Sequence, residues 1–450
     1  MREENGITLD INLCVKTISE LEPIYNHKFQ LLAEAMPKKV IKTAPKCMYK
    51  VDKTLSKVGE QWLEFLKKEN LPEDTTIIYQ NGNPQSVPQI KEWLFSLGWV
   101  PKTFKTNDKK EEVPQISLPF GQGLCQSIKD LFDEHPVLKE LDSLFTLKHR
   151  IGFLESFLES MDKFGKIYCK ARGLTKTLRW QHCKPLANMP GVDKPYANSI
   201  RDCLTVPNNN YTLFGVDMCA LEDTTKQHYI YFFDPKYVEE MRVPGFDPHL
   251  DIACLANLIT EEQSDFYKNY KNDSSDEDKE LYKFIKKQRS DAKQGNFACT
   301  YGAGPPKLAQ TLNLDLKSAE LLHATYWKRN YAVKLTEKQL KKQTVNNQLW
   351  VQNPISGIWL FVENEKDLFS AINQSSGVWV FDMFILNCLQ QGIIIPFEYH
   401  DEILFWVKND EIEDTKIKLQ NAIKQVNNLL KLNVTVDISI QIGKSYGSVH

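Results

Sequence analysis

Residues 281–306 read LYKFIKKQRSDAKQGNFACTYGAGPP, and functional side chains recur in this stretch at every fourth position. The spaced residues are Arg289, Lys293, Phe297 and Tyr301. On a helix such residues lie one above another and drift by ~40° per step, which predicts one face carrying two cations and then two rings. That face can offer a guanidinium and an ammonium to a triphosphate while the rings stack on a base. An ordinary amphipathic helix with solvated lysines explains each residue alone, but not the ordered set.

Two acidic segments are candidates for a metal site. Asp217 ends the apolar stretch Thr212–Val216, which predicts a buried strand, and Glu222 follows five residues later. Asp401 lies in the predicted hairpin 392–407, between two apolar segments. Carboxylates that converge from two strands can hold two Mg²⁺ ions, the usual arrangement for phosphoryl or nucleotidyl transfer. Taken singly, each acid is better explained by a solvated strand end or by turn chemistry.

The composition is that of a globular protein with several cores. The 450 residues suggest about three domains, since a domain has ~150 residues. No stretch approaches the ~18 apolar residues of a membrane span, and no signal-peptide pattern is present, so we expect a cytoplasmic protein. The ten cysteines show no metal-site spacing and are expected to be reduced. The net charge of −2 argues weakly against nucleic-acid binding, but it averages a basic stretch at 283–293 with an acidic one at 273–278.

Hydrophobic periodicity predicts a mainly helical region over residues 1 to about 170 and a mixed α and β texture after it. Within the first region the pattern predicts a long helix over 7–36 and two long helices over 128–164, with Pro136 near the start of the first. Tyr229–Phe233 reads as a strand on β-propensity alone. Residues 249–345 are again predicted to be helical.

Three segments together resemble family A DNA polymerases, the bacterial DNA polymerase I group. Residues 289–302 resemble the finger-helix motif of that family, residues 217–222 are similar to its first catalytic motif, and residues 400–402 to its third. The order and separations of the segments also agree. The run Leu97–Pro101 and the chain end at His450 resemble the phage replicative branch.

The resemblance implies an α+β fold shaped like a right hand, with a helical thumb, an antiparallel-sheet palm and helical fingers. The thumb is expected over residues 1–170 and the first part of the palm over 171–245. The fingers are expected over 246–345 and the second part of the palm over 346–450. In this fold Tyr229–Phe233 is expected to be helical.

The resemblance also assigns roles to residues at matching motif positions. Asp217 and Asp401 are expected to hold two Mg²⁺ ions, for which Mn²⁺ can substitute, with the Met218 carbonyl as an additional ligand. Lys293 is expected to act with the two aspartates in catalysis by protonating the departing pyrophosphate. The residues expected to bind the incoming dNTP are Arg289, Lys293, Phe297, His249, Glu222 and Tyr301. Those expected to contact the primer-template are Arg179, Arg201, Gln374, His400 and Glu402.

The resemblance therefore implies a template-directed DNA polymerase that adds dNTPs to a primer 3′ end and releases pyrophosphate. A single-subunit RNA polymerase-like enzyme and an inactive DNA-binding subunit stay open as alternatives, whereas a two-metal nuclease would not need the ordered segment 289–302. Because only about 170 residues precede the expected palm, we expect no 3′–5′ exonuclease in this chain. The expected partners are primer-template DNA and dNTPs, with a separate exonuclease, helicase-primase or processivity factor, and no membrane. If the chain is phage-encoded, its location is the cytoplasm of a bacterial host.

Overall fold

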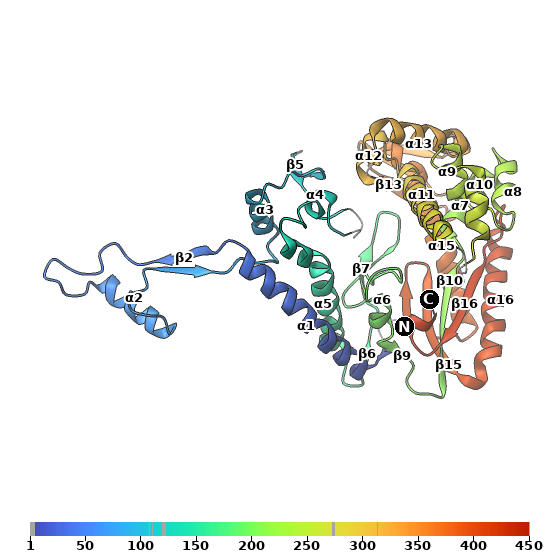
Figure 1. Cartoon of the computed structure of the whole chain (residues 1–450). Helices are drawn as coiled ribbons and strands as arrows, with labels where there is room; N and C mark the ends of the chain where they lie inside the picture. The colour runs from blue at the N-terminus through green and yellow to red at the C-terminus, as the bar shows by residue number, and fades with distance from the viewer. Residues whose placement is uncertain are drawn as a thin grey trace. The chain divides into compact units, whose positions relative to one another are not determined.

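The computed structural model describes residues 5–107, 109, 111–118, 123–271, 275–312 and 314–449 (Figure 1). The chain divides into two compact units, one formed by Met1–Cys14 with Ser156–His450 and the other by Val15–Glu155. The start of the predicted acidic stretch, including Asp273, lies outside the described residues, and so does His450. The expected thumb, residues 1–170, thus includes the whole of the smaller unit and short parts of the larger one.

The unit Val15–Glu155 is mainly helical, with two small antiparallel ribbons. Its helices are α1 (Ile11–Ala35), α2 (Lys57–Lys68), α3 (Val87–Ser96), α4 (Gln126–Lys129), the 3-10 helix η2 (Pro136–Leu141) and α5 (Leu144–Ser160). Its ribbons pair β2 (Lys39–Thr43) with β3 (Ile77–Gln80), and β4 (Phe104–Thr106) with β5 (Glu112–Pro114). The prediction of two long helices over 128–164 was wrong, because only α5 is long. Pro136 opens a short 3-10 helix, and Ser143, whose φ is 63°, turns the chain before α5 begins.

The larger unit contains a four-stranded antiparallel sheet in the order β14-β15-β10-β16. Its strands are β10 (Tyr211–Met218), β14 (Phe397–Tyr399), β15 (Glu402–Lys408) and β16 (Ile438–Gly443). Helices α7 (Leu221–Ile230), α15 (Leu368–Gln390) and α16 (Ile412–Leu430) accompany the sheet. The predicted strand Thr212–Val216 and the predicted hairpin are therefore confirmed, although the first hairpin strand begins at Phe397 rather than at Gly392.

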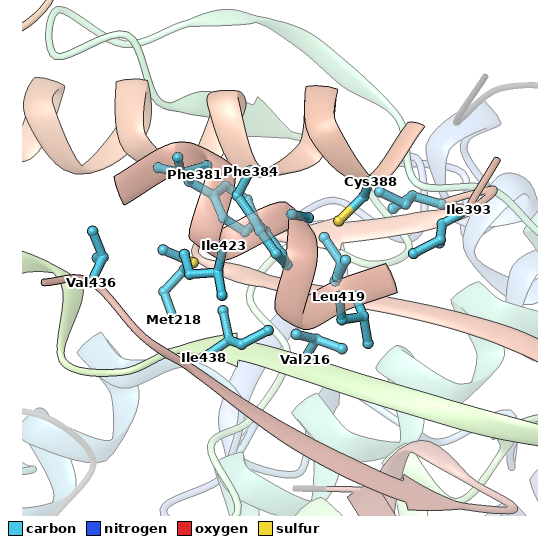
Figure 2. Packing of buried hydrophobic residues seen from close by; sticks show 14 of the residues in the cluster. Val216, Met218, Phe381, Phe384, Cys388, Ile393, Leu419, Ile423, Val436 and Ile438 are labelled. Carbon is cyan, nitrogen blue, oxygen red and sulfur yellow. The ribbon is translucent and has the colours of Figure 1, made fainter. Parts of the chain in front are cut away.

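One face of this sheet is covered by α15 and α16, and the hydrophobic core lies between the sheet and these two helices (Figure 2). Alternate residues of β10, among them Val216 and Met218, point into this core, since successive side chains of a strand face opposite ways. They meet Phe384 of α15 and Leu419 of α16, and burial of such a side chain contributes roughly 1.5–3 kcal/mol. Asp217, between two core residues, consequently faces the other side of the sheet.

The opposite face of the sheet is approached closely by the chain end. The 3-10 helix η5 (Tyr446–Val449) packs there, and a side chain on Gly215 would place its Cβ 2.6 Å from the Val449 carbonyl oxygen. Gly215 therefore has no room for a larger residue.

A helical subdomain follows the first palm segment and corresponds to the expected fingers. It contains α8 (Pro235–Met241), α9 (Pro248–Leu255), α10 (Glu261–Asn269), α11 (Asp276–Thr300), α12 (Pro305–Leu312), α13 (Leu316–Arg329) and α14 (Tyr331–Gln339). The segment 289–300 lies in α11, as its four-residue spacing predicted, and Ser275 caps the start of that helix. Gly295 lets α11 pack directly on Leu322 of α13, because an added Cβ would lie 2.9 Å from the leucine side chain.

The remaining elements of the larger unit are short strands and short helices. They are β1 (Ile7–Leu9), β6 (Lys166–Ile167), β7 (Ala171–Leu174), β8 (Trp180–His182), α6 (Ala197–Arg201), β9 (Leu204–Thr205), β11 (Lys342–Val345), β12 (Gln348–Gln352), β13 (Trp359–Val362), η3 (Glu365–Asp367) and η4 (Asn409–Glu411). The strand predicted from β-propensity at Tyr229–Phe233 is absent, because α7 continues through Ile230 and the chain then turns. Within the described residues no helix combines the length and apolar character that a membrane span requires.

Candidate active site

The two candidate metal-binding aspartates lie on neighbouring strands of the palm sheet. Asp217, near the end of β10, is paired in register with Glu402 of β15, and Asp401 immediately precedes that residue. The Met218 amide donates a hydrogen bond to the Asp401 carbonyl at 3.1 Å, which ties the turn to the end of β10. His400 and Asp401 form a two-residue turn in which His400 has a φ of 58°, a left-handed conformation that histidine tolerates better than most residues. The fold thus brings together two acids that are 184 residues apart in sequence.

The chemistry of this donor set suits a hard divalent cation. Burial raises the pKa of Asp401, as expected for a carboxylate withdrawn from water, and a bound cation would offset this effect. Burial also lowers the pKa of His400, which leaves the neighbouring ring neutral near pH 7. No group of three or more His, Cys, Asp or Glu side chains able to hold a metal occurs among the described residues. The candidate set is instead two carboxylates and a main-chain carbonyl, and oxygen ligands of this kind fit Mg²⁺.

A cavity of ≈780 Å³ lies between Asp401 of the palm and the fingers helix, and Asp217 is not among the residues that line it. Asp401 and His400 line it from the palm, and α11 contributes residues spaced along one face. The predicted site residues that line the cavity are Arg179, Glu222, His249, Arg289, Lys293, Phe297, Tyr301, His400 and Asp401. The residues spaced by four on α11 therefore form part of one concave site that also includes Asp401, a candidate metal ligand.

The candidate triphosphate-binding groups gather where α11 passes the start of α9. Arg289 donates to the Asp247 carboxylate at 2.6 Å, and Asp247 also caps α9 by accepting from the amides of His249 and Leu250. Burial alone would raise the pKa of Asp247, but the hydrogen bond from Arg289 and the cap amides lower it, so the acid is ionised. Lys293, one turn further along α11, is exposed to the cavity. Arg289 is thus held in place by a carboxylate before any triphosphate arrives.

His249 is a neutral member of this cluster. Burial lowers its pKa from 6.5 to about 4, and the neighbouring Arg289 and Lys293 charges act in the same direction. The Asn296 side-chain amide donates a hydrogen bond to the His249 Nδ1 at 3.0 Å. The proton of the neutral ring is then on Nε2, where it can be donated to a ligand. A neutral imidazole can therefore donate a hydrogen bond to a phosphate oxygen without adding a positive charge.

We expect His249→Gln to reduce the pH dependence of stability between pH 4 and 6.5. The unfolded chain binds a proton at His249 in this range and the folded chain does not, so the contribution of the neutral ring is fully present above pH 6.5 and is lost as the pH falls. Urea unfolding of both proteins at about pH 5 and pH 7.5 measures the effect, since the difference between their free energies of unfolding should change with pH. A difference that stays constant across the two pH values would contradict the prediction. The charged groups facing the ring are Asp223, Asp247, Arg289 and Lys293.

Glu222 joins the palm to the end of the fingers helix. Its carboxylate accepts hydrogen bonds from Arg179 and from the Tyr301 hydroxyl, the latter at 2.8 Å. Burial, followed by the Glu222 charge, raises the pKa of Tyr301 to about 12, so the hydroxyl stays protonated and donates. Asn373 of α15 donates to the Glu222 main-chain carbonyl at 2.9 Å. Glu222 is therefore fixed at both its main chain and its carboxylate.

The aromatic residues of α11 are available to a ligand. Phe297 is 42% exposed and Tyr301 37% exposed, and both line the cavity. The Phe297 ring lies 6.1 Å from the His249 ring, and Gln374 of α15 lies beside the side chain of Tyr301. Exposed rings beside phosphate-binding cations can stack on a base.

Arg201 and Glu402, both predicted to contact the primer-template, are buried in the structure. Arg201 is 3% exposed, donates to the Pro190 carbonyl at 3.1 Å, and lies over the Tyr446 ring. Glu402 is 4% exposed and accepts from the Tyr446 hydroxyl at 2.7 Å. The two residues therefore hold η5 against the palm here, and their contact with DNA stays a prediction.

Lys226, which the sequence did not single out, also lines the cavity. Lys226 follows Glu222 by four residues on α7, a spacing that places both on one face of that helix. Burial lowers the pKa of Lys226, and the Asp223 carboxylate opposes the shift. If the helix had been predicted from the residues alone, the four-residue spacing from Glu222 would have indicated that Lys226 lies on the same face.

The antiparallel palm sheet with paired acids, facing a fingers helix with aligned cations and rings, defines a right-hand polymerase domain. The solved structure of the POL domain of Pol1 from M. smegmatis, in complex with DNA primer-template and dNTP, matches with a TM-score of 0.65 at 17% identity. The match covers 98% of this chain and 68% of that one. At this identity the likeness establishes the fold, and it confirms the predicted α+β architecture.

Sequence comparison finds two proteins named DNA polymerase I. DNA polymerase I of Helicobacter pylori strain 26695 is 24% identical over 354 residues, which is 72% of this chain and 35% of that protein. The corresponding enzyme of strain J99 is 24% identical over 368 residues, or 74% of this chain and 36% of that protein. No family model matches the chain. The chain is thus similar in sequence to DNA polymerase I enzymes and in fold to a polymerase domain, and it spans about a third of the length of these curated relatives.

Proposed function

We propose that this chain is a template-directed DNA polymerase that adds dNTPs to a primer 3′ end and releases pyrophosphate. The observation that carries the proposal is a single cavity lined by Asp401 of the palm, Glu222 of α7, and Arg289 and Lys293 of α11. Asp401, a candidate metal ligand, therefore lines the same cavity as cations that fit a triphosphate. The relatives named DNA polymerase I support the same activity.

Asp217 and Asp401 would hold the two metal ions from adjacent strands, with the Met218 carbonyl completing the donor set. Bound Mg²⁺ ions supply activation of an attacking oxygen and stabilisation of the leaving group in such transfers. The tie between the Met218 amide and the Asp401 carbonyl fixes the separation of the two acids. Positioning of this kind accounts for much of the catalysis in phosphoryl transfer.

The fingers residues would bind and orient the incoming dNTP. Arg289 and the neutral His249 would contact phosphate oxygens, and Lys293 would provide a proton to the departing pyrophosphate. Phe297 and Tyr301 would lie against the base and sugar, as their exposure in the cavity supports. Arg179, Gln374 and His400 would contact the primer-template next to the palm acids.

Primer extension on a defined template with Mg²⁺ tests the proposal directly. We expect extension with dNTPs and little with rNTPs, because the resemblance gives Glu222 a place beside the sugar 2′ position, where a hydroxyl would need room. Extension with rNTPs in preference to dNTPs would instead indicate the RNA polymerase-like alternative. Tight DNA binding without any extension would indicate an inactive DNA-binding subunit, although Asp217 and Asp401 are both present in the chain.

We further propose that this chain has no 3′–5′ proofreading activity of its own. The resemblance places its residues in the polymerase domain, and the match to the M. smegmatis domain over nearly the whole chain supports this assignment. Metal-dependent shortening of a labelled single strand by purified protein would refute the proposal. A separate exonuclease, helicase-primase or processivity factor, and a role in phage replication in the host cytoplasm, stay predictions.

A further inference from the structure

Lys226 is a cationic side chain in the cavity to which the proposed function gives no role. It lies on α7 together with Glu222, Asp223 and Gln227, and all four residues line the cavity. Positions four apart share one face of a helix, so Lys226 lies about 6 Å further along α7 than Glu222 on the same face. This face of α7 and the candidate triphosphate-binding residues of α9 and α11 therefore line one cavity.

The Lys226 ammonium is partly buried and has no acid in contact with it. In the part of the chain that the structure describes it forms neither an ion pair nor a hydrogen bond, and its Nζ lies 5.7 Å from the centre of the Tyr326 ring. Burial lowers the pKa of Lys226, and the Asp223 charge opposes this effect. Withdrawing a cation from water in this way costs free energy, and an anion that enters the cavity would offset that cost.

Asp223 is the acid that acts on Lys226, but its carboxylate already has another partner. The Gln227 side-chain amide donates a hydrogen bond to it at 2.8 Å. The Asp223 charge acts on the pKa of His249 as well as on that of Lys226. Asp223 therefore lies within electrostatic range of both residues, which places Lys226 close to the candidate phosphate-binding groups.

The charge balance of the cavity depends on Lys226. Among the described residues that line the cavity, four are lysines or arginines and four are acids. Two of the cations, both arginines, already form ion pairs with acids of the cavity. Lys226 and Lys293 are the other two, so without Lys226 the acids would outnumber the cations. A triphosphate carries several negative charges, and such a surplus of acids would weaken its binding.

Two amide oxygens in the cavity also need hydrogen-bond donors. Asn330 is 1% exposed, and its Nδ2 donates to the Tyr326 carbonyl at 3.0 Å. Its Oδ1, like the Oδ1 of Asn296 on α11, has no hydrogen-bond partner among the described residues, and both residues line the cavity. Water molecules that hydrate a bound phosphate group can donate to such oxygens. The cavity near Tyr326 therefore suits a polar, hydrated ligand.

We propose that Lys226 is a further triphosphate-binding residue, which contacts the terminal phosphates of the incoming dNTP from the α7 wall of the cavity. The inference rests on the proposed function, since it names a residue that binds the substrate of that reaction. A lysine contacts phosphate oxygens as a point charge on a flexible stem, so the ammonium can reach the ligand without movement of α7. Because the contact is with phosphates alone, its effect should be equal for all four bases.

The alternative is a purely structural role, in which Lys226 only offsets the Asp223 charge. The two roles differ in what happens to phosphate binding when the ammonium is removed. A structural lysine would change the stability of the protein and leave the affinity for phosphate compounds as it is. A triphosphate-binding lysine would change that affinity whether or not the compound carries a base and a sugar.

The test compares wild type with Lys226→Met, which removes the charge but nearly keeps the length of the side chain, and with Lys226→Arg, which keeps the charge. The matched control is Lys236→Met, at an exposed lysine of α8 that is not among the described residues lining the cavity. Isothermal titration calorimetry with inorganic tripolyphosphate and Mg²⁺ on the primer-template complex measures phosphate binding without any reaction. Single-turnover incorporation on the same complex gives the Kd of the dNTP and the maximal rate separately. Thermal unfolding reports whether each variant is folded.

We expect Lys226→Met to weaken the binding of tripolyphosphate and of all four dNTPs by at least ~10-fold, as for the loss of one hydrogen bond between charged groups. The maximal rate should change little, because the contact exists before and during the reaction alike. Lys226→Arg should keep most of the affinity, and the control should match wild type in every measurement.

Wild-type affinities for tripolyphosphate and dNTP in Lys226→Met would overturn the inference and leave Lys226 with a structural role. If Lys226→Met does not fold, Lys226→Gln takes its place in the same measurements, with the same expected and contradicting results. A wild type that binds tripolyphosphate but incorporates no nucleotide would instead count against the proposed function, so the two failures are distinguishable.

Discussion

Asp401→Asn should lower the rate of primer extension by about 10³-fold, because the stabilisation that a metal site supplies is worth several kcal/mol and each ~1.4 kcal/mol is tenfold in rate. Asparagine has the shape of aspartate but only one carbonyl oxygen and no charge. The turn itself should survive, since it is tied to β10 through the Asp401 main-chain carbonyl and not through the side chain. Single-turnover incorporation on a pre-bound primer-template measures the chemical step.

Asp410→Asn is the matched control for this substitution. Asp410 lies beyond the opposite end of β15 and is exposed, so removal of its charge should leave incorporation unchanged. DNA affinity and thermal unfolding should be near those of wild type for both variants. Undiminished extension by Asp401→Asn would contradict the proposed mechanism, and so would an equal decrease in the control.

The finger helix could be predicted from sequence because its signal is local. Arg289 and Tyr301 share one face of a helix through backbone geometry alone, and the structure forms that helix and turns the face to a cavity. The end of β10 at Asp217 and the hairpin turn at Asp401 were predictable for the same reason. Their convergence was inferred from the resemblance, and the register between β10 and β15 now places the two acids on neighbouring strands.

Other contacts of the site could not be predicted because they depend on residues far apart in sequence. Asp247 is 42 residues from Arg289, and nothing in either segment indicates that they pair. Arg201 and Glu402 are buried by Tyr446, so their exposure could be judged only once the chain end had been placed. The resemblance assigned both residues to the primer-template, although charged side chains of this kind are seldom as buried as they are here.

The secondary-structure predictions were wrong where the hydrophobic pattern of the sequence conflicts with the backbone or with the packing of other elements. A helical hydrophobic period continues across 128–164, but Pro136 and the left-handed Ser143 interrupt it. Strands β2 and β3 were not predicted, since a ribbon exposed on both faces has no buried side to produce an alternating pattern. The β-branched and aromatic residues around Tyr229 suggested a strand, yet Tyr229 and Ile230 are buried at the end of α7, in a core that they share with residues of α15.

Glu222→Ala should raise the use of rNTPs relative to dNTPs by on the order of 10- to 100-fold, the range expected when a pocket wall is cut back by a few heavy atoms. The carboxylate is held by Arg179 and by Tyr301 at 2.8 Å, so it cannot swing aside to admit a 2′ hydroxyl without breaking both contacts. Alanine removes that obstacle and frees the two partners.

Glu222→Gln separates the steric contribution of this side chain from its charge. Glutamine fills the same volume and can accept a hydrogen bond from Tyr301, so it should keep most of the discrimination while weakening the contact with Arg179. The measurement is the ratio of kcat/KM for dNTP to kcat/KM for the matching rNTP, determined for wild type and both variants on one template. If alanine left the ratio unchanged, Glu222 would not exclude ribonucleotides. If glutamine relaxed the ratio as much as alanine, discrimination would depend on the carboxylate charge and its ion pair with Arg179, and the volume of the side chain would not be the cause.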